Sequence, residues 1–219
     1  MAKSFQIPVD TQKLYHRAYL LSLVTIFYNI IEGLVSTFYG AGDETLALFG
    51  FGVDSFIEVV SAIGIAHMIM RMRNTVIAER DKFEIQALRI TGSAFYILTF
   101  SLCAGSIINI IYRAEPITTF WGIVISSISI ITMYALFSYK IKVGKALGSE
   151  PIISDANCTK TCFYLSFILL GSSLLYEFFR IPYVDAVGSL GIAWYAFREG
   201  REAFEKAKSK SLSCDDDCC

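Results

Sequence analysis

Long apolar runs recur along the whole of this 219-residue chain and constrain its fold more than any other feature. Each is about 20 residues long or longer, which is the length of a membrane-crossing helix. They cover residues 14–39, 46–70, 85–112, 117–141, 151–179 and 183–205. At about 1.5 Å per helical residue, every run can cross a hydrocarbon core of about 30 Å. The sequence therefore predicts an all-α integral membrane protein with six transmembrane helices.

Charge is scarce in the chain as a whole. Charged residues make up 18% of the chain, against about a quarter in a soluble domain. The net charge of -1 leaves no broad basic surface, so we expect lipid and not nucleic acid as a partner. We divide the chain into a cytoplasmic N-terminal segment (1–13), a six-helix transmembrane domain (14–205) and a cytoplasmic tail rich in Cys and Asp (206–219). The polar sequence from residue 208 onward predicts disorder.

The connections between the runs predict the orientation. Basic residues gather near both ends, in the connection 71–84, and in the connection 140–150, which carries Lys140, Lys142 and Lys145. The connection 40–45 has no basic residue. Lysine and arginine are enriched on the cytoplasmic side of membranes. We therefore expect both termini to be cytoplasmic, in the plasma or inner membrane of the cell.

Ionisable groups inside two of the runs point to a binding site. Asp54 and Glu58 lie four residues apart in the second run, and Cys158 and Cys162 lie four apart in the fifth. Residues at this spacing share one helix face, and carboxylates inside a membrane are too costly to be explained by packing alone. Two such pairs on facing helices would supply four ligands for a tetrahedral divalent metal ion.

The depth of the two pairs supports this hypothesis, but the cysteines have other interpretations. Glu58 and Cys162 each lie about 12 residues, or ~18 Å, from one end of their helices, so both fall near the middle of the membrane. A free cysteine also packs well as a small apolar residue. A thiol redox pair is a further alternative, although its usual spacing is Cys-x-x-Cys.

Six further residues are candidate accessory groups: Glu32, Asp155, Asp185, Cys214, Cys218 and Cys219. Glu32 and Asp185 could line an aqueous path for ions or relay protons. Asp185 could equally be stabilised by the dipole of the helix that begins there. The three C-terminal cysteines could collect soft metal ions, carry palmitoyl groups, or have no role.

The motifs resemble the cation diffusion facilitator (cation efflux) family. DSFIE (54–58) is similar to the ligand pair of the family's second helix, and SDANCTKTC (154–162) is similar to the ligand motif of its fifth. ERDKFEIQAL before the third run and YVDAVGSLGIA at the sixth also resemble family sequences. The resemblance implies a six-helix bundle with both termini cytoplasmic that exports zinc or a related divalent ion in exchange for protons.

Two departures from the family change what we expect. The thiols of Cys158 and Cys162 stand where the family has imidazole and carboxylate groups, and thiolates favour Zn²⁺, Cd²⁺ or Hg²⁺ over hard ions. The family's cytoplasmic metal-binding domain has no counterpart in the sequence, so we expect the transmembrane domain only. The family is dimeric, which leaves a homodimer as an expectation.

We therefore expect a secondary transporter of a thiophilic divalent metal, and not an enzyme. The metal ion would be cargo and not a permanently bound cofactor. Two alternatives remain. One is a membrane metal sensor or adaptor that does not transport. The other is a membrane thiol oxidoreductase that uses Cys158 and Cys162.

Overall fold

The computed structural model describes residues 9–41, 46–72, 77–112, 119–179 and 184–216. These residues form six long helices, as the apolar runs predict. They are α1 (Val9–Ala41), α2 (Leu46–Met72), α3 (Ile77–Tyr112), α4 (Phe120–Leu147), α5 (Glu150–Phe179) and α6 (Val184–Asp216).

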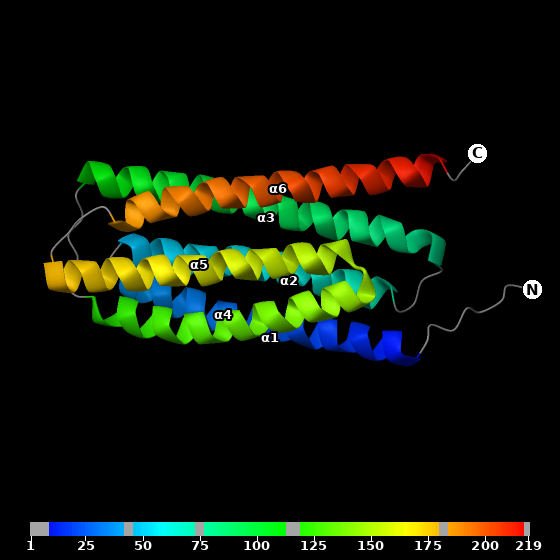
Figure 1. The fold of residues 1–219 in the computed structure, drawn as a ribbon, viewed down its shortest axis with the longest axis horizontal. Coiled ribbons are helices and arrows are strands. Elements are labelled where there is room, and N and C mark those ends of the chain that lie inside the picture. The colour runs from blue at the N-terminus through cyan, green and yellow to red at the C-terminus, as the bar shows by residue number, and fades with distance from the viewer. Residues whose placement is uncertain (1–8, 42–45, 73–76, 113–118, 180–183, 217–219) are drawn as a thin grey trace, which may run out of the picture.

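The helices run up and down in one elongated bundle (Figure 1). The start of α1 and the end of α6 lie at the same end of the bundle, together with the end of α4 and the start of α5. An even number of crossings places both chain ends on one side of a membrane, so the arrangement fits the predicted topology. That this side is the cytoplasm stays a prediction.

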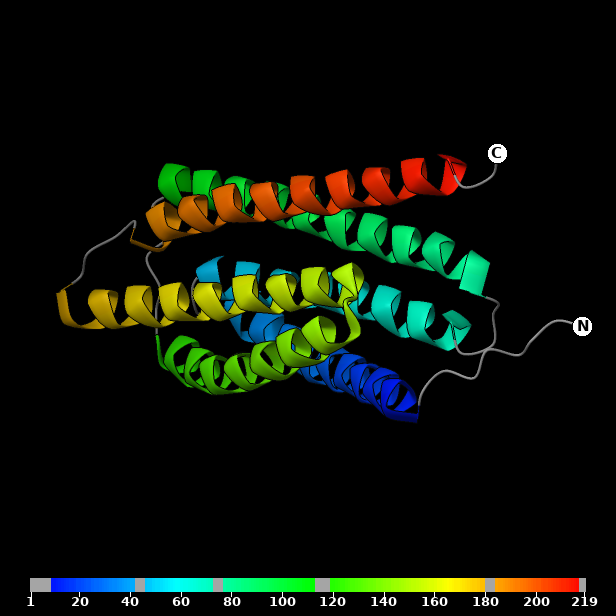
Figure 2. The same ribbon diagram turned by 45° about the vertical axis from the view of Figure 1, so that its right-hand side comes forward.

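The second helix lies at the centre of the bundle. Of its membrane-spanning stretch 67% is buried, whereas no other span exceeds 39%. α2 contacts α1, α3 and α5, and α5 contacts α2, α3, α4 and α6. α3 and α6 lie side by side in both views (Figures 1 and 2). The polar groups of α2 and α5 are therefore held where lipid and water have least access.

Five of the helices are long and apolar enough to cross a membrane, namely α1 to α5. α6 does not meet that criterion over its described residues, because charged side chains such as Arg198, Glu202 and Lys206 fill its second half. Large apolar side chains cover the outside of the bundle. Phe38, Phe100 and Ile131 are each about three-quarters exposed, as expected of side chains that face lipid.

α3 and α6 are held together by a close approach of their backbones. A Cβ atom on Gly200 of α6 would lie 3.1 Å from the Phe95 Cβ atom and 3.3 Å from the Gly92 carbonyl oxygen, both in α3. Small residues let membrane helices come this close. Six residues further along α6, the ammonium of Lys206 contacts the Glu150 carboxylate of α5 at 2.8 Å. Partial burial of this lysine opposes its charge, but hydrogen bonds to Glu150 and Glu202 raise its pKa.

The predicted connection at 140–150 is wrong, because α4 continues to Leu147 and only two residues separate it from α5. Gly148 ends α4 with φ 60°, a left-handed conformation that glycine adopts without steric cost. Its N–H and that of Ser149 both return to carbonyl oxygens of the last turn of α4. Lys140 is therefore a residue of the bundle interior and not of a loop.

The C-terminal sequence also differs from expectation. Disorder was predicted from residue 208, but α6 is helical as far as Asp216. Its earlier turns place Ala196, Ala203 and Ala207 in the interior. Ala207 lies beyond residue 205, where the predicted sixth membrane-spanning run ends. The buried alanines therefore stabilise α6 in a part of the helix whose opposite face is polar.

Candidate metal site

α2 and α5 face each other at the centre of the bundle and bury all four candidate ligands. Asp54 and Glu58 in α2, and Cys158 and Cys162 in α5, are each no more than 1% exposed. Glu58 and Cys162 lie near the midpoints of their helices. The depth predicted from the sequence therefore matches the positions of the residues along both helices.

Asp54 and Cys162 are in direct contact. The Cys162 thiol donates a hydrogen bond to Asp54 Oδ2, with 2.8 Å between sulfur and oxygen. The other oxygen, Asp54 Oδ1, is buried without a hydrogen-bond partner among the described residues. A carboxylate and a thiol from two different helices thus meet inside the bundle, and one carboxylate oxygen is left with unused capacity to bind a cation.

Glu58 lies one turn further along α2 and has different neighbours. Its Oε1 atom accepts a hydrogen bond from the Thr159 hydroxyl and lies 3.5 Å from Lys140 Nζ. Its Oε2 atom is buried with no partner in the part of the chain that the structure describes. A buried oxygen without a partner costs free energy. A bound cation would supply the missing partner of Glu58 Oε2.

Cys158 lies on a neighbouring face of α5. Its side chain belongs to the apolar core that includes Ile57, Leu98 and Leu165. Over the described residues, no three His, Cys, Asp or Glu side chains are grouped closely enough to hold a metal ion in this conformation. Convergence of all four ligands on one ion stays a prediction.

Lys140 is buried, although we expected it in the cytoplasmic connection 140–150. Its ammonium contacts Asp155 Oδ2 at 2.9 Å and donates a hydrogen bond to Thr159 Oγ1 at 2.8 Å. The signal for burial was present in the sequence. Met133, Leu136, Lys140 and Val143 follow each other at intervals of three or four residues and form one buried face of α4.

Asp155 links the lysine to two more helices. Ser61 of α2 donates a hydrogen bond to Asp155 Oδ1 at 2.7 Å, and Ser61 also contacts the Thr91 hydroxyl of α3 at 3.1 Å. Four helices therefore share one buried polar network between the candidate ligands and the end of the bundle where α5 begins. Its members are Glu58, Ser61, Thr91, Lys140, Asp155 and Thr159.

The other candidate accessory residues differ in how much the structure says of them. Glu32 of α1 is buried and accepts hydrogen bonds from Tyr28 at 2.8 Å and from Ser55 at 3.0 Å, so it lies beside the turn of α2 that carries Asp54. Asp185 and Cys214 are in α6, but their side chains are outside the described part of the structure. Cys218 and Cys219 lie beyond the described residues.

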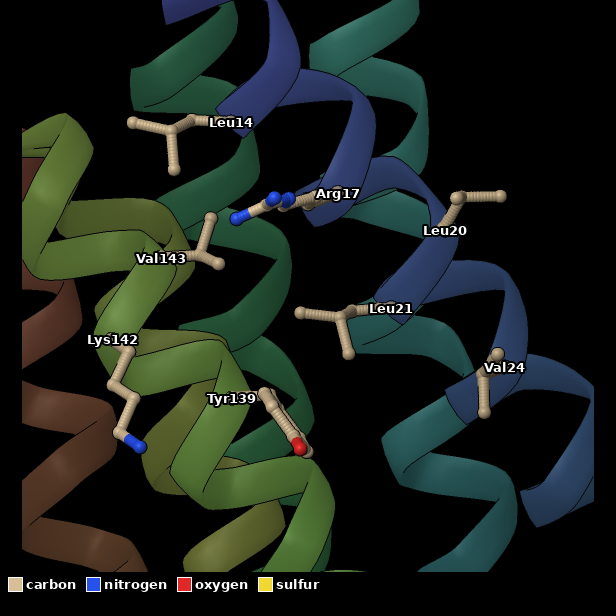
Figure 3. Close-up of a pocket in the computed structure, with 8 residues that line it drawn as sticks. All are labelled: Leu14, Arg17, Leu20, Leu21, Val24, Tyr139, Lys142 and Val143. Carbon is tan, nitrogen blue, oxygen red and sulfur yellow. The ribbon is translucent and has the colours of Figure 1, made fainter. Parts of the chain in front are cut away.

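A cavity of about 380 Å³ lies elsewhere, on the outer side of α1 and α4 (Figure 3). It is lined by Leu14, Arg17, Leu20, Leu21, Val24, Tyr139, Lys142 and Val143. Figure 3 shows the Arg17 side chain extending from α1 towards Val143 of α4. The cavity contains none of the four candidate ligands, which in this conformation are enclosed by the bundle.

The sequence profile of the cation efflux transmembrane domain matches residues 18–210. The chain belongs to the cation efflux family. The match runs from α1 into the second half of α6 and includes Asp54, Glu58, Cys158 and Cys162, so it confirms the resemblance predicted from the motifs. It also makes α6 part of the family domain, although its described residues are too polar to qualify as a span by themselves.

Two relatives of this cation efflux protein are 24% identical to it. One is transmembrane protein 163 of Xenopus laevis, aligned over 186 residues, which are 84% of this chain and 64% of the relative. The other is the uncharacterized transporter MJ0449 of Methanocaldococcus jannaschii, aligned over 175 residues, or 78% of this chain and 62% of the relative. The chain spans somewhat less than two thirds of the length of both relatives.

Proposed function

We propose that this cation efflux protein is a secondary transporter that carries a thiophilic divalent metal ion across the membrane. The site would consist of Asp54, Glu58, Cys158 and Cys162. The observation that carries the proposal is the buried contact between the Cys162 thiol and the Asp54 carboxylate near the middle of the family domain. Ionisable groups buried inside a membrane bundle mark ion pathways in many transporters.

The unused oxygens of the two carboxylates support binding of a cation. Asp54 Oδ1 and Glu58 Oε2 are buried without partners in the described structure. Buried polar atoms are nearly always paired in proteins, and a bound cation would pair both. Cys158 would complete the ligand set by turning out of its apolar neighbours, so that the site closes around the ion only when the ion is present.

The ligand types favour soft ions and a coupling to protons. Thiolates prefer Zn²⁺, Cd²⁺ or Hg²⁺ to Mg²⁺ or Ca²⁺. Four negative groups cannot stay ionised together in an empty, buried site, so some of them carry protons when the metal is absent. The contact between the Cys162 sulfur and Asp54 Oδ2 is one place where a proton would be held between two of these ligands. Metal binding would displace such protons, and we propose this exchange as the basis of antiport. The bundle would cross the membrane six times with both termini in the cytoplasm.

Transport in liposomes tests the proposal directly. Purified protein would be reconstituted in vesicles that enclose a metal-sensitive dye, and influx of Zn²⁺ and Cd²⁺ would be recorded. We expect the double variant Asp54→Ala, Cys158→Ala to lose transport. Cys103→Ala is the matched control, because Cys103 is a free cysteine that is only partly buried and lies in α3. Parental influx in the double variant would contradict the proposed site.

Selectivity tests the role of the thiols separately. The variant Cys158→His, Cys162→Asp places an imidazole and a carboxylate at the positions of the two thiols. We expect its Cd²⁺ influx to fall relative to its Zn²⁺ influx, because both soft ligands are gone. Unchanged selectivity would count against thiol ligation. Metal binding without influx in the parent would instead support the alternative of a membrane metal sensor.

A further inference from the structure

The buried lysine in α4 has the surroundings of a bound cation. Lys140 is 2% exposed, and its ammonium contacts the hydroxyl of Thr159 at 2.8 Å, Asp155 at 2.9 Å and Glu58 at 3.5 Å. A lysine ammonium is a compact charge with three donors and no acceptor. Burying it is costly unless it is paired. Three oxygens from α2 and α5 therefore hold this charge much as they would hold a small free ion.

The two carboxylates that face Lys140 are not equivalent. Asp155 makes the shorter contact and is fixed by a hydrogen bond from Ser61, which in turn contacts Thr91. Glu58 makes the longer contact, and it is also the candidate ligand whose Oε2 atom is unpaired in the described structure. Asp155 therefore anchors the ammonium, whereas the contact with Glu58 is the weaker one.

We propose that Lys140 is a built-in competitor for the transported ion. Its ammonium holds Glu58 when no metal is bound, and an incoming divalent ion takes Glu58 and displaces the ammonium onto Asp155. This inference rests on the proposed function, because it assumes that Glu58 is a ligand. It assigns to Lys140 a role in setting the affinity, and to Asp155 the role of retaining the lysine during the exchange.

The competition predicts the direction of the change in affinity. A ligand that binds only one of two forms has an apparent Kd raised in inverse proportion to the fraction of that form. If the ammonium holds Glu58 for nine tenths of the time, removing the ammonium should tighten binding about tenfold. A lysine with a purely structural role gives the opposite result, because its loss would loosen the site.

Equilibrium binding of Cd²⁺ to the purified full-length chain in detergent, measured by isothermal titration calorimetry, provides the test. We expect Lys140→Met to bind Cd²⁺ about tenfold more tightly than the parent. Lys140→Arg retains a positive charge and should show no such gain. Asp155→Asn takes away the anchor, leaves the ammonium with Glu58, and should bind several times more weakly. A parental or weaker Kd in folded Lys140→Met would overturn the proposal, as would an equal gain in Lys140→Arg.

A second pair of variants protects the test against loss of folding. Lys140→Met leaves two carboxylates facing each other, which can prevent assembly. The double variant Lys140→Met, Asp155→Asn removes one charge of each sign, and its reference is Asp155→Asn alone. The double variant should bind Cd²⁺ at least about tenfold more tightly than this reference. Equal affinities would contradict the competition.

The outcomes separate this inference from the proposed function. If the parent binds no Cd²⁺, or binds it equally well after Asp54→Ala, then the proposed site fails and the competition fails with it. If the parent binds Cd²⁺ in a manner that requires Asp54, while the lysine variants keep the parental Kd, then the proposed function stands and only the role of Lys140 is rejected.

Discussion

Replacing Asp155 by Asn tests whether the buried polar network stabilises the bundle. The change keeps the shape of the side chain and its ability to accept the hydrogen bond from Ser61, but it removes the charge that faces Lys140 at 2.9 Å. Removing one partner of a buried ion pair costs about 3–5 kcal/mol. The contact that remains for the ammonium, to Glu58, is longer at 3.5 Å and replaces the lost contact only in part. One kcal/mol shifts the Tm of a chain of this size by about 2–4 °C. We therefore expect Asp155→Asn to lower the Tm by about 6–20 °C.

An exposed ion pair of the same length provides the control. Arg201 and Glu205 in α6 are 2.8 Å apart but are both more than 60% exposed. Such exposed pairs contribute little to stability, so Glu205→Gln should shift the Tm far less than Asp155→Asn does. Comparing the two variants isolates the effect of burial at nearly constant distance.

The assay is a thermal melt of the purified protein in detergent, followed by the fluorescence of Trp121 and Trp194. Lys140→Met in the Asp155→Asn background should recover part of the lost Tm, because the buried ammonium that lost its closer partner is then absent. Coupling of this kind is what a double-mutant cycle detects. If Asp155→Asn melts within 2–3 °C of the parent, or if the losses of the two single variants simply add, the reasoning about the pair is refuted.

Three further predictions concern packing, the turn and the tail. Gly200→Leu should destabilise the protein by about 1–3 kcal/mol in the same melt, because the leucine side chain would collide with Phe95. Gly191→Leu is the control and should be nearly neutral, because a Cβ atom at Gly191 has nothing within 4 Å. Gly148→Ala should cost about 1–2 kcal/mol, since alanine is strained at φ 60°, and a parental Tm would refute this account of the turn. Deleting residues 211–219 should slow influx only at low metal concentration if the C-terminal cysteines collect ions; equal slowing at saturating metal would exclude that role.

The six helices and the positions of the candidate ligands along α2 and α5 could be predicted from the sequence. Apolar runs as long as a bilayer is thick leave few alternatives to a helical bundle. The i, i+4 spacing and the matched depths of Glu58 and Cys162 were enough to place α2 against α5. Such arguments work because helix length and helix faces are local properties of the chain.

The rest depended on contacts between residues far apart in the sequence. Lys140 was assigned to a cytoplasmic connection because lysine is usually found there. Its contacts with Asp155 and Thr159, which the sequence did not reveal, explain how its charge is accommodated in the interior. Cys158 and Cys162 both belong to apolar clusters, yet among the described residues it is the Cys162 thiol that has a hydrogen bond to a candidate ligand of α2. Rotation of a helix by a fraction of a turn is set by packing, and periodicity does not determine it.

The two-residue turn at Gly148 has a consequence for how the bundle can move. α4 and α5 form a helical hairpin whose ends are joined by this turn, and Ser129 and Ser166 link the same two helices deeper in the bundle at 2.9 Å. The Lys140–Asp155 contact lies inside the hairpin and should persist if the hairpin moves as one body. The contact of Lys140 with Glu58 crosses to α2, so a movement of α2 relative to the hairpin would release Glu58 for an ion while Lys140 stays with Asp155.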